Sequence, residues 1–228
     1  MNIIITGASK GIGYDTALKL AESPENKILI LSRNEQKIKE LATKSKNIEY
    51  LSFDITSPDI DALLQKVEAM GGVDILLNNA GLLINKPFRQ LTMSDWQRSF
   101  GTNILGVVGL IRTLLPYLEK SLNAHIINIG SMGGFQGSSK FPGLSAYSAS
   151  KAAVANLTEC LAEELKDQKI AVNCLAFGAV QTEMLETAFP GYQAPLNSEK
   201  MAEWVAWFCL NGQQFFNGKI LPVSVSTP

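Results

Sequence analysis

The stretch "NIIITGASKGIG", residues 2–13, decides the fold because it joins an apolar run directly to a glycine-rich turn. The run at 2–6 is typical of a parallel strand buried on both faces. Gly7, Gly11 and Gly13 then open a helical pattern. In such a turn one glycine allows the tight bend, another lets the backbone approach a pyrophosphate, and a third lets the helix pack closely on the strand. Taken alone, the turn is equally consistent with an ordinary strand–helix connection.

The rest of the chain repeats this alternation of strand and helix. Further strands are expected at 27–32, 48–53, 73–78, 124–130, 170–176 and 219–225, and helices at 12–22, 35–45, 58–70, 94–120, 146–167 and 198–210. Such alternation forms right-handed βαβ units. The sequence therefore predicts an α/β fold: a doubly wound, mainly parallel seven-stranded sheet (Rossmann fold) with helices on both faces. No linker or repeat interrupts it, so residues 1–228 are expected to form one domain.

Three long irregular segments, 79–93, 131–145 and 177–197, each follow a strand. They therefore lie at the carboxyl edge of the sheet, where doubly wound folds bind ligands. The glycine turn lies at the same edge, where the N–H groups of a helix N-terminus attract phosphate. The segment at about 177–197 is expected to form a mobile substrate loop. Its Phe189 and Tyr192 indicate a partly apolar, aromatic pocket.

Composition excludes several classes of function. The chain has 20 basic and 21 acidic residues, which argues against nucleic acid or an anionic membrane as partner. His125 is the only histidine, so a two-histidine metal site is excluded and any His-assisted nucleophile must use it. Cys160, Cys174 and Cys209 are far apart in apolar surroundings and are expected to be buried free thiols, with no metal bound. With no signal peptide and no apolar run approaching a membrane span, we expect a cytoplasmic protein.

The end of the second expected strand reads "LSRN" and bears on the choice of nucleotide. Ser32 and Arg33 stand where a carboxylate would bind an adenosine ribose hydroxyl. Arg33 can pair with a 2′-phosphate through its forked donors, and Lys10 in the glycine turn can add charge. The sequence therefore favours NADP(H) over NAD(H). The alternative is that Arg33 only solvates a loop.

Several motifs occur together in one order: "TGASKGIG" (6–13), Asp54 in "FDI", "NNAG" (78–81), Asn103 in "TNILG", Ser131 in "NIGSMGG", and Tyr147 with Lys151 in "YSASK". From residue 6 to about residue 182 the chain resembles the short-chain dehydrogenase/reductase family in its single-domain form. The resemblance implies an NAD(P)-binding oxidoreductase. It also implies a homodimer or homotetramer in which the 94–120 and 146–167 helices pack against their symmetry mates.

The resemblance assigns residues to the cofactor and to catalysis. Asp54 and Ile55 would line the adenine pocket, and Val180 and Thr182 would contact the nicotinamide carboxamide. The full cofactor set is Gly7, Ser9, Lys10, Gly11, Ile12, Gly13, Arg33, Asp54, Ile55, Asn79, Ala80, Gly81, Tyr147, Lys151, Val180 and Thr182, and the catalytic set is Asn103, Ser131, Tyr147 and Lys151. From the residues alone, "NNAG" is also typical of an ordinary turn, and Asn103 of a residue that bends or caps a helix.

Tyr147 and Lys151 are one helical turn apart, so they share a helix face. A free tyrosine has a pKa of about 10, and a neighbouring ammonium favours the phenolate. The tyrosine can then exchange a proton with a substrate oxygen while a hydride moves to or from nicotinamide. At this spacing alone, such a pair is more often a set of surface neighbours.

The catalytic serine is less certain than the tyrosine. Ser131 is expected to bind the substrate oxygen because it directly follows a strand. The interval from Ser131 to Tyr147 is longer than the family usually shows, so Ser138, Ser139 and Ser145 are rivals. The chain also carries Phe177-Gly178 where the family commonly has Pro-Gly.

These motifs together predict an NADP(H)-dependent oxidoreductase acting on a carbonyl or secondary alcohol. One alternative is an NAD(P)-binding sensor or scaffold protein without turnover. Another is a sugar epimerase or dehydratase on the same fold, although such enzymes usually have a larger C-terminal substrate region.

Overall fold

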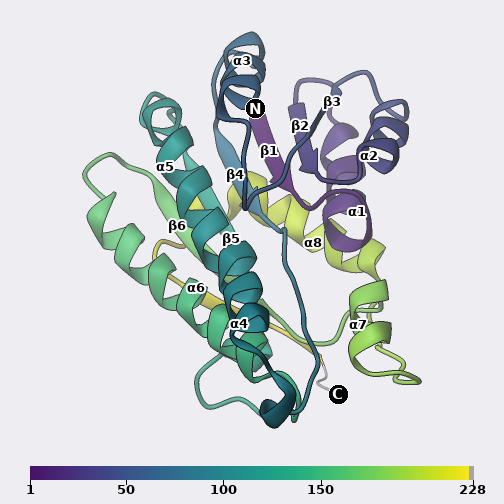
Figure 1. Cartoon of the computed structure of the whole chain (residues 1–228). Helices are drawn as coiled ribbons and strands as arrows, with labels where there is room; N and C mark the ends of the chain where they lie inside the picture. Colours follow the sequence, from purple (N-terminus) through teal and green to yellow (C-terminus); the bar gives the residue numbers. More distant parts are fainter. Residues whose placement is uncertain (226–228) are drawn as a thin grey trace.

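Seven parallel strands form one sheet in the order β3-β2-β1-β4-β5-β6-β7 in the computed structural model, which describes residues 1–225 (Figure 1). The strands are β1 (Asn2–Thr6), β2 (Lys27–Ser32), β3 (Ile48–Ser52), β4 (Ile75–Asn78), β5 (His125–Ser131), β6 (Ala171–Phe177) and β7 (Ile220–Val223). Ile4 of β1 pairs with Leu29 on one side and Leu76 on the other. The strand order therefore reverses between β1 and β4, which creates the crevice where such sheets bind ligands.

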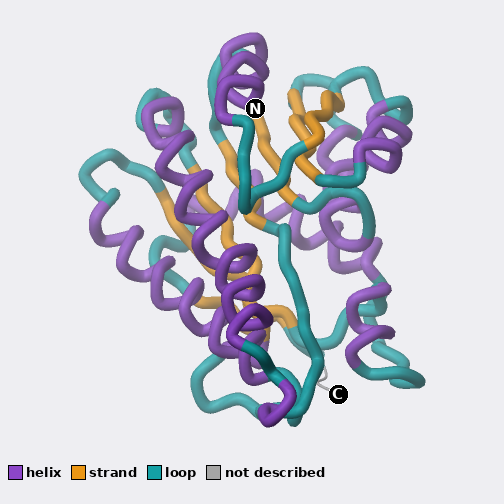
Figure 2. The backbone as a smooth tube through the Cα atoms, viewed as in Figure 1, coloured by secondary structure: helices purple, strands orange, loops and turns teal. Residues whose placement is uncertain are grey.

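Helices cover both faces of the sheet, as predicted (Figure 2). They are α1 (Gly11–Ala21), α2 (Glu35–Ala42), α3 (Ile60–Met70), α4 (Met93–Phe100), α5 (Gly106–Leu118), α6 (Ser145–Glu164), α7 (Glu183–Ala188) and α8 (Ser198–Asn211). Side chains alternate along a strand. Ile3 and Ile5 therefore pack with α1, α2 and α8, whereas Ile4 packs with α3, α5 and α6. The continuous apolar runs of the strands fill both layers.

The helix predicted over 94–120 is interrupted. After α4, the five-residue segment η2 (Gly101–Leu105) is π-helical, and α5 begins at Gly106. Short helices also occur in the segments predicted to be irregular: η1 (Phe88–Gln90), η3 (Met132–Gly134) and α7. A π-helical turn inserts an extra residue and is frequent at functional sites. Here it carries Asn103.

We expected no segment long and apolar enough to span a membrane. Judged by length and composition alone, this expectation is wrong. Among the described residues, the helical stretch Met93–Leu118 is long and apolar enough to cross a bilayer. Its inward side chains, including Val107, Leu110 and Leu114, pack in the core beneath the sheet. The core helix of a globular domain passes the same test, so this stretch is weak evidence for a membrane.

His125, Cys174 and Cys209 lie in the core, whereas Cys160 lies at the surface. His125 is fully buried in β5, and its Nδ1 lies 3.3 Å from the Cys209 carbonyl oxygen. Burial lowers the pKa of His125 to about 4, so the ring is neutral at pH 7. All three cysteines are free, but Cys160 is exposed, which corrects the expectation that each is buried. His125 is thus a core residue and activates no nucleophile.

Candidate active site

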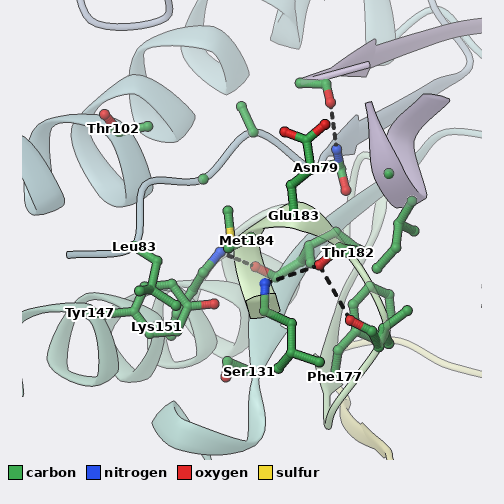
Figure 3. A pocket seen from close by; sticks show the side chains of 18 of the residues that line it. Asn79, Leu83, Thr102, Ser131, Tyr147, Lys151, Phe177, Thr182, Glu183 and Met184 are labelled. Carbon is green, nitrogen blue, oxygen red and sulfur yellow. Dashed lines mark hydrogen bonds between the residues drawn. The ribbon is translucent and has the colours of Figure 1, made fainter. Parts of the chain in front are cut away.

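A cavity of about 340 Å³ lies at the carboxyl edge of the sheet. Residues from the ends of β1, β2, β4, β5 and β6 line it, together with residues from α6 and α7 (Figure 3). Each of the three long segments predicted at this edge contributes to its wall. All predicted site residues line the cavity except Gly13 and Asn103, which lie directly behind it.

The glycine turn presents an open helix N-terminus to this cavity. Gly7 and Gly11 have positive φ angles of 70° and 59°, which favour glycine. Helices α2, α3 and α4 are each capped by a side chain. In contrast, the N-cap residue of α1, Lys10, makes no side-chain cap, and the first turn of α1 has no acidic residue. Its first N–H groups and its partial positive charge are therefore available to an anion. The turn fits the diphosphate of a dinucleotide.

Asn79 and Gly13 hold this turn from behind. The Asn79 Nδ2 donates hydrogen bonds to the carbonyl oxygens of Thr6 (3.0 Å) and Gly7 (3.1 Å). A Cβ atom on Gly13 would lie 2.3 Å from the same nitrogen. The role of Gly13 is therefore close packing. Asn79 lines the cavity, but the structure shows its amide group bonded to the turn.

The end of the cavity away from Tyr147 carries charged side chains. Arg33, Asp54 and Ile55 line it. The Asp54 carboxylate accepts hydrogen bonds from the Thr56 hydroxyl (2.7 Å) and amide (2.9 Å), which together with nearby Arg33 hold its pKa below the usual value. Lys10 forms an ion pair with Glu183 at the start of α7. No sequence pattern indicated this ion pair, because Lys10 and Glu183 are far apart in the chain.

Tyr147, Lys151 and Ser131 meet at the other end of the cavity. The Lys151 Nζ lies 5.8 Å from the centre of the Tyr147 ring and donates a 2.6 Å hydrogen bond to the Ile129 carbonyl oxygen. Burial lowers the pKa of Lys151 to about 8. Burial also raises the pKa of Tyr147, although a hydrogen bond with Ser131 acts in the opposite direction. The phenol is therefore neutral at pH 7, contrary to the direction expected from the ammonium alone.

The position of Ser131 separates it from its rivals. Ser131 ends β5, lines the cavity and is bonded to Tyr147. The Ser138 hydroxyl donates to the Phe135 carbonyl oxygen within its own loop, and Ser139 is exposed. The Ser145 hydroxyl is buried at the start of α6, outside the cavity wall. The geometry therefore favours Ser131.

Asn103 supports the site from the π-helical turn. Its Oδ1 accepts a hydrogen bond from the Leu82 amide (2.8 Å), and its Nδ2 donates to the Ser150 hydroxyl (2.8 Å). A Cβ atom on Gly81 would lie 3.6 Å from both the Asn103 Oδ1 and the Lys151 Nζ. Asn103 thus ties the loop after β4 to α6 beside Lys151.

Val180 and Thr182 line the cavity between β6 and α7. Thr182 caps α7, because its side chain accepts a hydrogen bond from the Leu185 amide (3.3 Å). Phe177, which replaces the family's proline, remains in β6 and pairs with Val223. The next residue, Gly178, also bonds to Val223 (3.0 Å). The strand therefore holds this turn without a proline.

Known proteins resemble this chain over most of its length. The family model described as short chain dehydrogenase matches residues 1–193. An uncharacterised oxidoreductase of Staphylococcus epidermidis is 31% identical over 207 residues, 90% of this chain and 88% of that protein. A 3-oxoacyl-[acyl-carrier-protein] reductase of Thermotoga maritima is 32% identical over 188 residues, 80% of this chain and 75% of that protein.

Solved structures show the same architecture. A 3-ketoacyl-(acyl-carrier-protein) reductase from Brucella melitensis, complexed with NADH, has a TM-score of 0.88 at 28% identity, covering 98% of this chain and 96% of that one. A structure described as ElxO with NADP bound has a TM-score of 0.85 at 27% identity, covering 98% and 96%. The two neighbours thus carry different nicotinamide cofactors.

Proposed function

The chain belongs to the short-chain dehydrogenase family, and we propose that it is an NADP(H)-dependent oxidoreductase acting on a carbonyl or secondary alcohol. One observation carries the proposal: Tyr147, Ser131 and Lys151 open into the same cavity as the uncapped N-terminus of α1. A proton donor and a turn that can bind a dinucleotide, both in one cavity, suit hydride transfer coupled to proton transfer. A sensor protein without turnover needs only the glycine turn that binds the nucleotide.

Different residues of the chain would bind different parts of the cofactor. The amides of Gly11 and Ile12 would bind the diphosphate, Asp54 and Ile55 would flank the adenine, and Val180 and Thr182 would contact the carboxamide. When bound, the nicotinamide supplies or accepts the hydride. Lys151 would bind the ribose next to the nicotinamide while it remains bonded to the Ile129 carbonyl.

Proton transfer falls to Tyr147. Its neutral phenol suits the donation of a proton to a carbonyl oxygen during reduction. Ser131, bonded to that phenol, would share the substrate oxygen and stabilise its developing charge. Lys151 would strengthen the acid through its positive charge. Asn103 is a positioning residue, because it fixes α6 through Ser150.

We test the overall proposal by following NADPH and NADH oxidation with a panel of aldehydes, ketones and sugars. Reduction of at least one carbonyl compound, with nicotinamide consumed in equal amount, is the expected result. Binding of nicotinamide nucleotides with no turnover across the panel would instead support the sensor.

The charge on Lys151 predicts a pH dependence. Since burial lowers its pKa to about 8, the amine is protonated below that pH and loses its proton above it. We expect kcat/KM for carbonyl reduction to be level from pH 6 to 7.5 and to fall above about pH 8. Steady-state rates at saturating NADPH would measure this, with activity restored on return to pH 7 as the control. A level profile up to pH 10 contradicts the role of the ammonium.

Cofactor preference depends on Arg33 and on the Lys10–Glu183 ion pair. Arg33→Ala should weaken NADPH binding by about tenfold and leave NADH nearly unchanged, because only NADPH carries the 2′-phosphate. Glu183→Gln should tighten NADPH binding, since Lys10 is then free to turn to the phosphate. Titration with NADPH and NADH measures both. Equal effects on the two nucleotides would show that Arg33 only solvates its loop.

We also propose that the protein forms a dimer or tetramer through α4, α5 and α6. Met93 and Leu105, on the Met93–Leu118 stretch, are 73% and 66% exposed, which is high for large apolar side chains. Light scattering of the purified protein measures the oligomeric state. A monomer at micromolar concentration would contradict this proposal.

A further inference from the structure

The substrate end of the cavity is covered by an aromatic roof, which we define as Phe141 and Phe189. Phe141 belongs to the long loop before α6, and Phe189 directly follows α7. Their rings meet edge to face, with centroids 5.5 Å apart, and both line the cavity. The long 131–145 loop and the substrate loop therefore meet over the pocket. A pair of this geometry is favourable beyond its buried area.

Asn85, in the loop after β4, holds this roof in place through a hydrogen bond. Its Nδ2 donates a 2.7 Å hydrogen bond to the Ala188 carbonyl oxygen, one residue before Phe189. The neighbouring Lys86 amide donates a 3.0 Å hydrogen bond to the Gly143 carbonyl oxygen, two residues after Phe141. The loop after β4 thus binds both sides of the roof. Contacts from three segments therefore hold the roof in place.

Beneath the roof the wall is apolar. Leu83, Met132, Leu144, Leu185 and Ala188 line the cavity together with the two roof residues, and Figure 3 labels Leu83 and Tyr147 among the lining side chains. Ser131 and Tyr147, the hydroxyl-bearing residues of the catalytic cluster, line the same cavity. This pattern predicts a ligand with one carbonyl oxygen and an otherwise apolar body.

Charged side chains near this end are already engaged. Lys140, in the long loop, donates hydrogen bonds to the Phe135 carbonyl oxygen (2.7 Å) and the Ser138 hydroxyl (2.9 Å). Lys86 forms an ion pair with Asp95 at 2.8 Å. Lys151 bonds to Ile129 and serves the catalytic cluster. A substrate carboxylate under the roof would therefore lose its hydration without gaining a free cation, which is costly.

We propose that the substrate is a free, uncharged carbonyl compound whose apolar body is held beneath Phe141 and Phe189. The inference rests on the proposed function and narrows its substrate class. It excludes carboxylate-bearing substrates of the same shape. It also disfavours acyl groups carried on a long thioester arm, because that arm would have to pass beside the two rings that meet over this end of the pocket.

Three probes test this substrate class with NADPH: acetophenone, 4-acetylbenzoate and acetoacetyl-coenzyme A. Acetophenone is expected to have the highest kcat/KM, by about tenfold or more. An equal or higher value for the carboxylate or the thioester would overturn the inference while leaving the oxidoreductase proposal intact. No reduction of these three or of the wider carbonyl panel would contradict the proposed function itself.

Roof variants provide a second test. Phe189→Ala should raise KM for acetophenone about tenfold and change kcat little, because the roof binds the apolar body and takes no part in proton transfer. Phe215→Ala, a change at a 67% exposed ring outside the cavity wall, is the matched control. An unchanged KM in Phe189→Ala would contradict the proposal that Phe189 binds the apolar body of the substrate.

A charge introduced into the roof gives a gain-of-function test. Phe141 is only partly buried, so Phe141→Arg can be accommodated. It should shift the ratio of kcat/KM values toward 4-acetylbenzoate by about tenfold, because a free guanidinium then faces the pocket. Calorimetric binding of 4-acetylbenzoate supplies a readout that does not depend on turnover. An unchanged ratio and unchanged binding would show that substrates do not lie beneath Phe141.

Discussion

Replacing Tyr147 by phenylalanine is expected to reduce kcat by about 10³-fold, which is within the range for loss of a general acid. The change removes only the hydroxyl, which bonds with Ser131 and opens into the cavity. The ring that lies beside Lys151 remains, so NADPH should bind nearly as before. Measuring NADPH consumption and NADPH binding on the same preparation separates the chemical step from cofactor binding.

Tyr117→Phe is a matched control for this variant. Tyr117 lies on α5, and its hydroxyl bonds with Glu68 at 3.2 Å, away from the cavity. The same loss of a hydroxyl there should leave turnover unchanged. Full activity in Tyr147→Phe would rule out Tyr147 as the proton donor and would transfer that role to another group.

Replacing Gly13 by alanine is expected to disturb both the fold and cofactor binding. Its Cβ would lie 2.3 Å from the Asn79 Nδ2 and 2.9 Å from the Gly7 carbonyl oxygen. Asn79 would have to move, which breaks its bonds to Thr6 and Gly7. Overpacking and the lost hydrogen bonds together should lower the free energy of unfolding by about 2–4 kcal/mol. NADPH binding should weaken about tenfold or more, because the turn that presents the α1 amides is displaced.

Urea unfolding and NADPH titration measure these two effects. Gly101→Ala is the matched control, since a Cβ there would meet its nearest neighbour, Thr56, at an ordinary 4.0 Å. In an Asn79→Ala background the cost of Gly13→Ala should shrink, because the clashing nitrogen is absent. Equal costs in the two backgrounds would show that Gly13 and Asn79 do not act as a unit.

The sheet and its glycine turn were predictable because their causes are local. Apolar runs such as 2–6 and 170–176 can only be buried on both faces, and Gly7 and Gly11 adopt the positive φ angles that the turn requires. The π-helical interruption at Gly101–Leu105 was not predictable. Asn103 bonds there to Leu82 and Ser150, which lie in other segments.

The residues that line the cavity were largely predictable from the sequence, but their electrostatics were not. The spacing of Tyr147 and Lys151 places them on one helix face, which an ammonium effect alone would make favourable for the phenolate. In the structure, burial instead raises the pKa of Tyr147, and the hydrogen bond with Ser131 acts in the opposite direction. Burial depends on how the whole cavity packs, and no local pattern reports it.

By itself the sequence determined the alternation of strands and helices, the glycine turn and the order of the motifs, because periodicity and glycine conformation act over a few residues. The tertiary structure alone decided which serine lines the cavity, that Glu183 pairs with Lys10, and that Phe141 meets Phe189. Each of these depends on segments that are distant in the chain and are brought together only when the carboxyl ends of the strands meet. The contacts that would choose cofactor and substrate therefore arise from the packing of loops, which periodicity does not encode.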